Sequence, residues 1–459
     1  MKIQNLLDTD IFETAVLIFY LPDPGFFMTD KPFEPMDRWR FTAFFLPFAL
    51  FYAMCYLQRT AVPGTSFNYF QQTFGLSAGQ VSGLSASLIY IYAFCQPFAG
   101  FLADKYSGTR VFTVAGAIFC VGACLFPFCG GNVFLMYSCR FLIGLGSSGV
   151  YLSLLAELGR FCPRDKFSVF YGIFAATGYV GGLCGTLPFS VLCQHFDCLD
   201  VLKWCGGISL AFYLVFQLTK YVMPVAEIRN RRFSLLPLLE ILKTKTIWLP
   251  IFGVSVIFGC YSLIQMVFGV KFLQDFAGLT AIAASRTIFF QTIVSIMSLI
   301  LSGFTLRWLK NRRKPLMIFG SVITFTANAL LLFAVICHLP GPFFTIACLL
   351  FAAASGVAMS FVMTIMEMNR PENMAASAGL ANAFEYLFVA VFSVAAGKLL
   401  DSFVAPELFR SGVKVIYPEN AYVTLFALML IPSSLGVLGT FFIPETNGKY
   451  ALPNKSNRV

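Results

Sequence analysis

The stretch Gly100-Phe-Leu-Ala-Asp-Lys-Tyr-Ser-Gly-Thr-Arg110 decides how the rest of this chain is interpreted. It contains one acid, two bases and two glycines, and a long apolar run stands directly on each side of it. A polar connection this short between two apolar runs predicts a tight turn at a membrane surface. The neighbouring runs are then membrane spans, and the other loops can be oriented from this one.

The composition of the chain indicates that its solvent is lipid. Of the 459 residues, 58% are hydrophobic and only 12% are charged, whereas a soluble domain has about 25% charged residues. Mean hydropathy is +0.77, and a soluble core of this length could not hide so much apolar surface. The net charge of +10 is spread over loops in a way that argues for membrane topology, so we expect no nucleic-acid partner.

Cysteine and histidine usage argues against a metal site. Most of the 14 cysteines lie inside apolar runs, where cysteine behaves as a small hydrophobe, and no Cys-x-x-Cys pair is present. A bridge between Cys193 and Cys198 stays open if their loop faces an oxidising compartment. The two histidines, His195 and His338, fall in predicted loops. We therefore expect no metal, no cofactor and no histidine relay within the membrane.

The apolar runs predict an all-α membrane protein with twelve transmembrane helices in two pseudo-symmetric six-helix bundles. The spans are expected near 40–62, 80–103, 111–129, 133–157, 168–191, 205–224, 247–273, 285–307, 315–337, 342–366, 374–400 and 420–443. We divide the chain into a cytoplasmic or interfacial N-terminal segment (1–38), an N-terminal bundle (39–224), a basic cytoplasmic linker (225–246), a C-terminal bundle (247–445) and a cytoplasmic tail (446–459). The first helix is a candidate to continue past Pro63, because no charge stands between Arg59 and Asp104.

The basic residues are distributed unequally between the two sides of this topology. Twelve spans put both termini on one side, and the loops on that side hold most of the lysines and arginines: Lys105, Arg110, Arg160, Arg164, Lys166, Arg229, Arg231, Arg232, Lys243, Lys245, Arg307, Lys310, Arg312, Arg313 and Lys314. The opposite loops hold few, of which Lys203, Arg410 and Lys414 are clear cases. Basic loops stay in the cytoplasm, so we expect both termini there, in a plasma or inner membrane.

The two halves repeat each other weakly. The second-half stretch Gly303-Phe-Thr-Leu-Arg-Trp-Leu-Lys-Asn-Arg-Arg313 follows span eight as the opening stretch follows span two. Ser147-Ser-Gly-Val150 in span four has a counterpart in Ser355-Gly-Val357 in span ten. Repeated six-span halves are typical of carriers that bind a solute near the midplane between the halves.

These residues resemble the major facilitator superfamily of secondary transporters over about residues 40–445. The opening stretch is similar to the loop motif between spans two and three of that family, which implies a cytoplasmic gate formed by Gly100, Asp104, Lys105, Gly108 and Arg110, with Gly303 and Arg307 in the second copy. Because Arg307 replaces the acid there, Asp104→Asn is expected to impair cycling more than any single change in 307–313. Arg140-Phe-Leu-Ile-Gly-Leu-Gly146 resembles the span-four motif, and Phe442-Ile-Pro-Glu-Thr-Asn-Gly448 the Pro-Glu-Thr motif that closes several sugar and organic-solute carriers.

Within the superfamily, Tyr56-Leu-Gln-Arg59 is similar to an element of the organophosphate:phosphate antiporters and of the anion:cation symporters. The antiporters complete a phosphate clamp with a second arginine from span seven. This chain has Gln265 and Lys271 as the only polar candidates in that region. The resemblance therefore implies an anion site without implying a phosphate ester.

Charged and polar residues inside spans are the candidates for a solute site, because each charge there costs about 2.5–3.5 kcal/mol. The substrate-binding candidates are Arg59, Arg140, Tyr151, Gln265 and Lys271. Two interpretations stay open for each charge. Arg59 either binds the anion or is a snorkelling residue near the outer surface, and Arg140 either contacts the anion or anchors its helix at the outer interface. Lys271 either attracts anions at the outer mouth or caps its helix.

The acids give one candidate for proton coupling. Glu385 is the deepest acid and suits proton binding, although the resemblance implies that span eleven stands beside the cavity rather than on its wall. The alternative is a structural carboxyl hydrogen-bonded to a neighbouring helix. Glu157 and Glu367 lie near the cytoplasmic ends of spans four and ten, and we expect both at the surface.

The sequence thus predicts a secondary carrier that moves a small polar organic solute, with an organic anion favoured, by alternating access as a symporter or antiporter. A proton or a sodium ion is the candidate coupling ion. One rival is a proton-coupled carrier of amino acids, peptides or sugars that uses Glu385, and another is a transporter-like membrane sensor that binds solute without moving it. The chain lacks Gly-x4-Gly-Lys-Ser/Thr and His-Glu-x-x-His, so neither ATP-driven pumping nor an enzyme is expected. We expect a monomer in the lipid bilayer.

Overall fold

The computed structural model describes residues 38–162, 164–222, 236–370, 374–410 and 414–449, and in these ranges the regular elements are all helical. Twelve of the helical stretches are long and apolar enough to cross a membrane, which confirms the predicted number. In chain order they are built by α3 (Arg38–Thr60) with η2 (Ala61–Thr65), α5 (Ala78–Tyr106), α6 (Gly108–Leu125) with η3 (Phe126–Phe128), α7 (Val133–Phe161), α8 (Arg164–Cys184) with α9 (Leu187–His195), α10 (Cys198–Thr219), η5 (Lys245–Ile247) with α12 (Trp248–Leu263), η6 (Ile264–Phe268) and α13 (Gly269–Asp275), α14 (Ala281–Trp308), α15 (Lys314–Ile336), α16 (Gly341–Val357) with α17 (Met359–Glu367), α18 (Met374–Asp401) and α20 (Glu419–Phe442).

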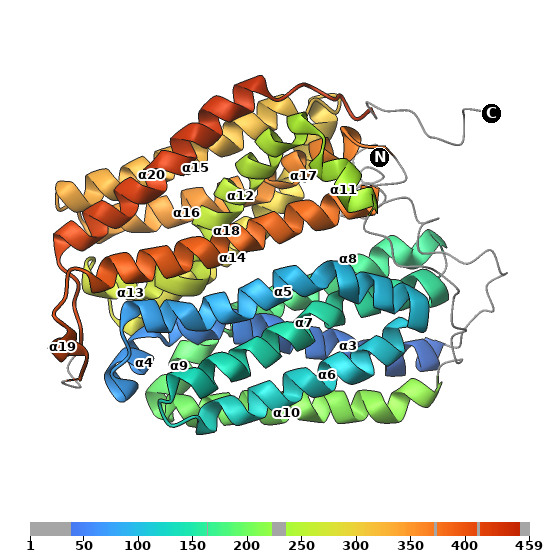
Figure 1. The fold of residues 1–459 in the computed structure, drawn as a ribbon, viewed down its shortest axis with the longest axis horizontal. Helices are drawn as coiled ribbons and strands as arrows, with labels where there is room; N and C mark the ends of the chain where they lie inside the picture. The colour runs from blue at the N-terminus through green and yellow to red at the C-terminus, as the bar shows by residue number, and fades with distance from the viewer. Residues whose placement is uncertain (1–37, 163, 223–235, 371–373, 411–413, 450–459) are drawn as a thin grey trace, which may run out of the picture.

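The helices of the two halves lie on opposite sides of the molecule, with α3 to α10 below and α12 to α20 above in Figure 1. The start of α3 and the end of α20 lie at one end of the bundle, which we call the terminus side. The short helices α4 (Phe67–Phe74) and α19 (Pro406–Arg410) lie at the other end, the far side. Large apolar side chains such as Phe134, Leu218 and Phe442, each 77% exposed, point outward, as expected for a lipid solvent.

Some predicted boundaries differ from the structure. Span six begins at Cys198 and ends at Thr219, whereas the sequence placed it at 205–224. The early start is possible because Asp200 and Lys203 pair at 2.7 Å on the exposed helix surface. A short helix, α11 (Leu236–Leu242), lies in the predicted linker. Residues 1–37 of the predicted N-terminal segment and 450–459 of the tail lie outside the described residues.

The turn between spans two and three is much shorter than the sequence suggested. Helix α5 continues to Tyr106 and α6 begins at Gly108, so Ser107 alone makes the turn, with φ of 107°. Asp104 and Lys105 therefore lie in the last turn of α5, while Arg110 lies in the first turn of α6 and is exposed. The side chain of Asp104 lies outside the described residues. Gly108 is buried, and a Cβ there would lie 2.0 Å from the carbonyl oxygen of Ser153 on α7.

Two acids that we expected at the surface are buried at the terminus side, so that prediction is wrong. Glu157 is 1% exposed and accepts a hydrogen bond of 2.7 Å from the backbone N–H of Thr109, in the first turn of α6. Glu367 is 8% exposed and pairs with Arg313 at 2.8 Å, directly before α15. In both halves, the acid at the end of the fourth span thus binds the start of the third, where the positive end of the helix dipole stabilises a carboxylate.

The closing Pro-Glu-Thr motif completes this arrangement in the second half. Glu445 accepts hydrogen bonds from the backbone N–H groups of Arg313 and Lys314, at 2.8 and 2.9 Å. The hydroxyl of Thr446 donates to Glu367. The motif therefore caps α15 and joins the end of the chain to spans nine and ten. In the second copy of the loop motif, Gly303 is half-buried in α14 and Arg307 is exposed.

The first spans of the two halves are both broken toward the far side, and the breaks touch each other. Helix α3 continues into the π-helical segment η2, and α12 continues into η6. A Cβ on Gly64 would lie 2.9 Å from the carbonyl oxygen of Met266, so only glycine allows this approach of the two backbones. π-Helical turns inside α-helices are frequent at functional sites, and here they mark the boundary between the halves.

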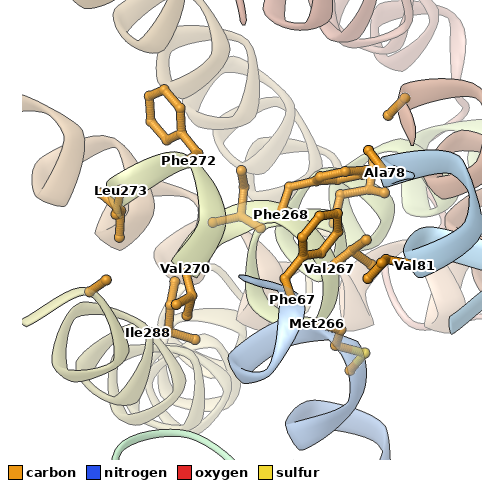
Figure 2. Close-up of a cluster of buried hydrophobic side chains, with 14 of the residues drawn as sticks. Phe67, Ala78, Val81, Met266, Val267, Phe268, Val270, Phe272, Leu273 and Ile288 are labelled. Atoms are coloured by element: carbon orange, nitrogen blue, oxygen red, sulfur yellow. The ribbon is translucent and has the colours of Figure 1, made fainter. Parts of the chain in front are cut away.

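Apolar side chains close the far side above this crossing. Figure 2 shows Phe67 from α4 beside Val267 and Phe268 from η6, with Val81 of α5 in the same cluster. The rings of Phe67 and Phe268 have centroids 5.5 Å apart. Each of these four side chains is at most 2% exposed. The cluster joins elements of both halves and excludes water from this end of the bundle.

Hydrogen bonds between the halves reinforce the closed far side. The Asp401 carboxylate, at the end of α18, accepts from the backbone N–H groups of Ala78 and Gly79 at 2.7 and 2.8 Å and from the Ser77 hydroxyl at 2.6 Å. It thereby caps the N-terminus of α5. Two further bonds cross nearby, from Asn68 to Gln274 at 2.7 Å and from Gln71 to Tyr417 at 2.8 Å. The structure is thus closed on the far side.

Candidate solute-binding cavity

A cavity of about 430 Å³ lies between the halves and reaches from the midplane toward the terminus side. Its inner wall includes Tyr56 and Gln265 beside the broken first spans, and its other end includes Leu155, Met366 and Gly379, which lie near the terminus-side ends of their spans. The polar side chains on the wall come from both halves: Tyr52, Tyr56, Thr60, Tyr92, Gln96, Tyr151, Tyr179, Tyr261, Gln265, Thr292, Ser295, Ser355, Asn382, Glu385 and Tyr386. The cavity therefore depends on the relative position of the two bundles.

Arg59 lies directly behind the tyrosines of this wall. Its side chain is 2% exposed, and its guanidinium carbon lies 4.8, 4.3 and 5.1 Å from the ring centroids of Tyr56, Tyr92 and Tyr386. One terminal nitrogen donates a 2.8 Å hydrogen bond to the Tyr386 hydroxyl, and Nε has no hydrogen-bond partner. Among the described residues, no carboxylate lies within ion-pair distance of Arg59. The guanidinium is thus a buried cation held by aromatic rings, and the bond to Tyr386 joins the two halves.

The C-terminal half contributes a wall of hydroxyl and amide groups. Gln265, a predicted candidate, donates a hydrogen bond of 2.7 Å to the Thr292 hydroxyl. The hydroxyls of Ser295 and Ser355 lie 2.6 Å apart. Tyr151, the other uncharged candidate, lines the N-terminal wall, where its ring stacks on Phe174 with centroids 5.8 Å apart. Uncharged groups of this kind suit a polar organic solute, because they can donate or accept hydrogen bonds.

Glu385 stands on the cavity wall, and the expectation that span eleven lies beside the cavity is wrong. Helix α18 contributes Ala378, Gly379, Asn382, Glu385 and Tyr386 to the lining. These positions recur every three to four residues, so one face of the helix forms a wall. Glu385 is 8% exposed. Helix α18 packs on α5 and α12, and this packing turns the face toward the cavity, which sequence alone did not reveal.

Arg140 does not line the cavity. Its side chain is completely buried in the second turn of α7, so it is neither at the edge of its span nor at an interface. Nε, Nη1 and Nη2 donate to the carbonyl oxygens of Leu84, Gln58 and Val62, at 3.1, 3.0 and 2.6 Å. Val62 has a non-helical backbone in η2, which deprives carbonyls of their usual helical partners. Arg140 supplies those partners and holds the break in the first span.

Lys271 is also held away from the cavity. Its ammonium group pairs with Asp275 at 2.8 Å, both side chains are 0% exposed, and it donates to the carbonyl oxygen of Val415. It also lies 5.2 Å from the ring centroid of Tyr417. The candidate cation at the outer mouth is therefore part of a buried ion pair under the closed far side, and its charge is already compensated.

Three functional side chains escaped the sequence analysis. Tyr386 holds Arg59, and Asn382 donates a hydrogen bond to Gln96 across the two halves at the cavity wall. Gln96 and Asn382 were detectable in principle, because an amide inside an apolar span needs a partner. Tyr386 carried no such signal, since tyrosine is abundant in this chain and its partner lies 327 residues away.

Comparison with known proteins agrees with this geometry. Residues 48–405 match the sequence profile of the Major Facilitator Superfamily. The chain belongs to the Major Facilitator Superfamily. Its members are transporters, so this chain is an integral multi-pass membrane protein of a transporter family.

Solved structures of this superfamily share the fold. A bacterial homologue of the human lysosomal transporter Spinster, in an inward-facing and unoccupied conformation, aligns with a TM-score of 0.69 and 15% identity, over 89% of this chain and 98% of that one. A D-xylose-proton symporter aligns with a TM-score of 0.67 and 15% identity, over 89% and 99%. Identities this low show the fold alone.

Curated relatives match over shorter stretches. "Probable sulfoacetate transporter SauU" of Cupriavidus necator is 23% identical over 36% of this chain and 38% of its own length. "Probable anion transporter 3, chloroplastic" of Arabidopsis thaliana is 27% identical over 29% of each protein. "Probable transporter MCH1" of Candida albicans is 32% identical over 33% of this chain and 36% of its own length. These alignments cover about a third of each relative.

Proposed function

We propose that this superfamily member is a secondary carrier of a small organic anion and that Arg59 anchors the anion. The observation that carries the proposal is the buried guanidinium of Arg59, for which the described residues offer no carboxylate partner. Removing a charge from water costs several kcal/mol. Cation–π contacts with three tyrosine rings offset part of this cost, at about 2 kcal/mol for a desolvated contact. An anion in the cavity would supply the missing opposite charge.

The chemistry of the wall favours an organic anion over an inorganic one. Guanidinium offers a planar donor fork that suits carboxylate, sulfonate and phosphate. Tyr52, Tyr151 and Phe258 on the cavity wall present apolar ring surface to a carbon skeleton. The volume of about 430 Å³ lies within the range of about 300–1,000 Å³ typical of small-molecule sites. The names of the sulfoacetate and anion transporters support the same class of solute.

Alternating access follows from the closed far side and the repeated halves. The basic loops favour a cytoplasmic terminus side, and in that orientation the present conformation is inward-facing. Outward opening then requires the bonds at Asp401 and the cluster around Phe67 to separate. The bond between Arg59 and Tyr386 joins the halves at the cavity. A solute that takes over the guanidinium would loosen this bond and so couple binding to rocking of the halves.

Ligand-induced stabilisation of purified protein tests the anchor. We expect sulfoacetate, or another member of a panel of carboxylates, sulfonates and phosphate esters, to raise the melting temperature and to show counterflow in proteoliposomes. Arg59→Ala is expected to abolish both effects, and Arg59→Lys to weaken them because the donor fork is lost. Arg286→Ala, which removes an exposed arginine from α14, is the matched control. Stabilisation by an anion that survives Arg59→Ala would contradict the proposal, and binding without counterflow would favour a sensor.

Proton coupling through Glu385 is a second proposal, supported by its position on the cavity wall. A carboxyl that alternates between a dry and a wet environment changes its proton affinity with conformation. Glu385→Gln is then expected to leave exchange of solute intact while removing accumulation driven by a pH gradient. Accumulation by this variant equal to that of the unchanged protein would exclude the role.

A further inference from the structure

A second hollow, of about 490 Å³, opens on the outer face of the C-terminal bundle. Helix α14 forms one wall with Met297, Leu301 and Thr305, α15 forms the other with Leu316 and Phe319, and α16 forms the floor. Its lining runs along α14 from residue 294 to residue 309, a length of about 22 Å at 1.5 Å per residue. Since half of the hydrocarbon core is about 15 Å thick, the groove spans the terminus-side leaflet.

The wall of this groove offers no free polar group from its hydroxyl side chains, because those that line it are already hydrogen-bonded to backbone carbonyls. The hydroxyls of Ser302 and Thr305 donate to carbonyl oxygens of their own helix, at 2.7 and 2.9 Å, and the hydroxyl of Ser298 donates to Ala353 across the floor. Met297, Leu301 and Phe319 are each more than 50% exposed. The groove therefore offers hydrocarbon surface to a chain lying along it.

Two unpaired cations stand at the terminus-side end of the groove. Leu309 and Pro315 line it, and the turn between them carries Lys310 and Arg312, both exposed. No described group pairs with either side chain. The turn is ordered by its own backbone, because Lys310 and Arg312 donate N–H bonds to the carbonyls of Arg307 and Leu309, at 3.0 and 3.1 Å. Both cations therefore project from an ordered turn at the end of the groove.

From this juxtaposition we infer a binding site for one anionic glycerophospholipid. One acyl chain lies in the groove between α14 and α15, and the phosphate lies against Lys310 and Arg312. Neighbouring cations are already engaged: Arg313 pairs with Glu367, and Lys314 donates to the carbonyl of Phe441. The bound lipid contacts the turn between spans eight and nine, at a place separate from the solute cavity.

Fluorescence quenching by brominated lipid tests the site, with Trp308 as the reporter at the end of α14, 82% exposed. The full chain, with the other three tryptophans changed to phenylalanine, is reconstituted in phosphatidylcholine vesicles. A minor fraction of either phosphatidylglycerol or phosphatidylcholine carries brominated acyl chains. We expect phosphatidylglycerol to compete for the reporter about 25-fold better, since each of the two basic groups near the surface contributes about fivefold.

The double variant K310Q/R312Q is expected to abolish this preference. K243Q/K245Q, which removes two exposed terminus-side lysines away from the groove, is expected to preserve it. A preference that survives in the first variant, or falls equally in both, would overturn the site in favour of general attraction to a basic surface.

The acyl-chain half of the site has its own test. Ala353→Leu fills the floor of the groove without changing a charge and is expected to reduce the preference as well. Arg307→Gln removes a cation that lies about 200° around the helix from Thr305, and we expect it to leave the preference for phosphatidylglycerol unchanged. A preference unchanged by Ala353→Leu in folded protein would refute insertion of a chain into the groove.

Discussion

Asp401 is the residue on which we expect the closed far side to depend most. Its carboxylate belongs to the C-terminal half, and the three groups that it accepts from belong to the start of α5 in the N-terminal half. Asp401→Asn preserves the shape of the side chain. It replaces one acceptor oxygen with an NH2 group, so in either orientation of the amide at least one of the three donors loses its acceptor, and the bonds that remain lose the negative charge.

The expected loss is equivalent to two charged hydrogen bonds. A hydrogen bond to a charged group contributes about 1.5–3 kcal/mol, and Asp401 is only half-buried, so the lower end of the range applies to the bond that is lost. The two bonds that remain, now to a neutral oxygen, lose about as much again together. In the outward-open state, water solvates both the aspartate and the asparagine side chain. The substitution therefore destabilises only the closed state. The balance then shifts by about 3 kcal/mol, a factor on the order of 100 in the ratio of open to closed molecules.

Thiol labelling measures this shift. Val267 is 0% exposed in the far-side cluster that Figure 2 shows, and Val267→Cys introduces a thiol of similar size there. A membrane-impermeant maleimide reaches this thiol only when the far side opens. Peptide mass spectrometry locates the label, so the native cysteines do not interfere. We expect Asp401→Asn to raise the labelling rate by about the factor of 100 derived above.

Asp200→Asn is the matched control, because it removes an acid from the same side of the membrane that pairs only within its own helix, at 51% side-chain exposure. Its labelling rate is expected to stay within a few-fold of the reference. A rate unaffected by Asp401→Asn would show that the apolar cluster alone closes the far side. Equal acceleration in both variants would mean that surface charge, rather than the cap on α5, sets the rate.

Two further predictions concern stability, each measured by detergent-titrated unfolding. Arg140→Gln is expected to lower the free energy of unfolding by about 3 kcal/mol, because glutamine replaces at most two of the three donors and leaves a buried carbonyl unpaired. A decrease as small as that expected for exposed Arg286→Gln, within about 0.5 kcal/mol, would contradict the role of Arg140 at the helix break. Gly108→Ala should cost about 1–3 kcal/mol, since its Cβ would lie 2.0 Å from the Ser153 carbonyl oxygen, whereas Gly172→Ala meets nothing within 4 Å. Equal stability of the two alanine variants would show that α6 can shift away from α7 at no cost.

The fold could be predicted because each span is a local property of the sequence. About twenty apolar residues must form a helix in lipid, where every backbone group needs a partner within its own segment. The number of spans and most boundaries follow from this rule, and the first span does run past Pro63, but the break at Val62 does not follow from it. Span six was misplaced because the rule counts apolar residues, while the real helix begins with an exposed Asp200–Lys203 pair.

The candidate site was only partly predictable, because its charges are indistinguishable until their partners are known. Arg59, Arg140 and Lys271 all appeared as costly cations inside spans. One faces tyrosine rings without a counter-ion, one bonds three carbonyls, and one pairs with an acid four residues later. The pair of Lys271 and Asp275 alone was local enough to read from spacing on a helix.

The opening stretch separates what sequence and tertiary structure each contributed. Sequence by itself determined that residues 100–110 connect two spans on the basic side, because hydropathy and charge act locally and additively. Only the packed structure decided that Ser107 alone makes the turn, that Gly108 lies against α7 and that Glu157 binds the start of α6. Those contacts join residues about fifty positions apart. They depend on which faces of neighbouring helices meet, and lipid-facing and buried surfaces are equally apolar in sequence.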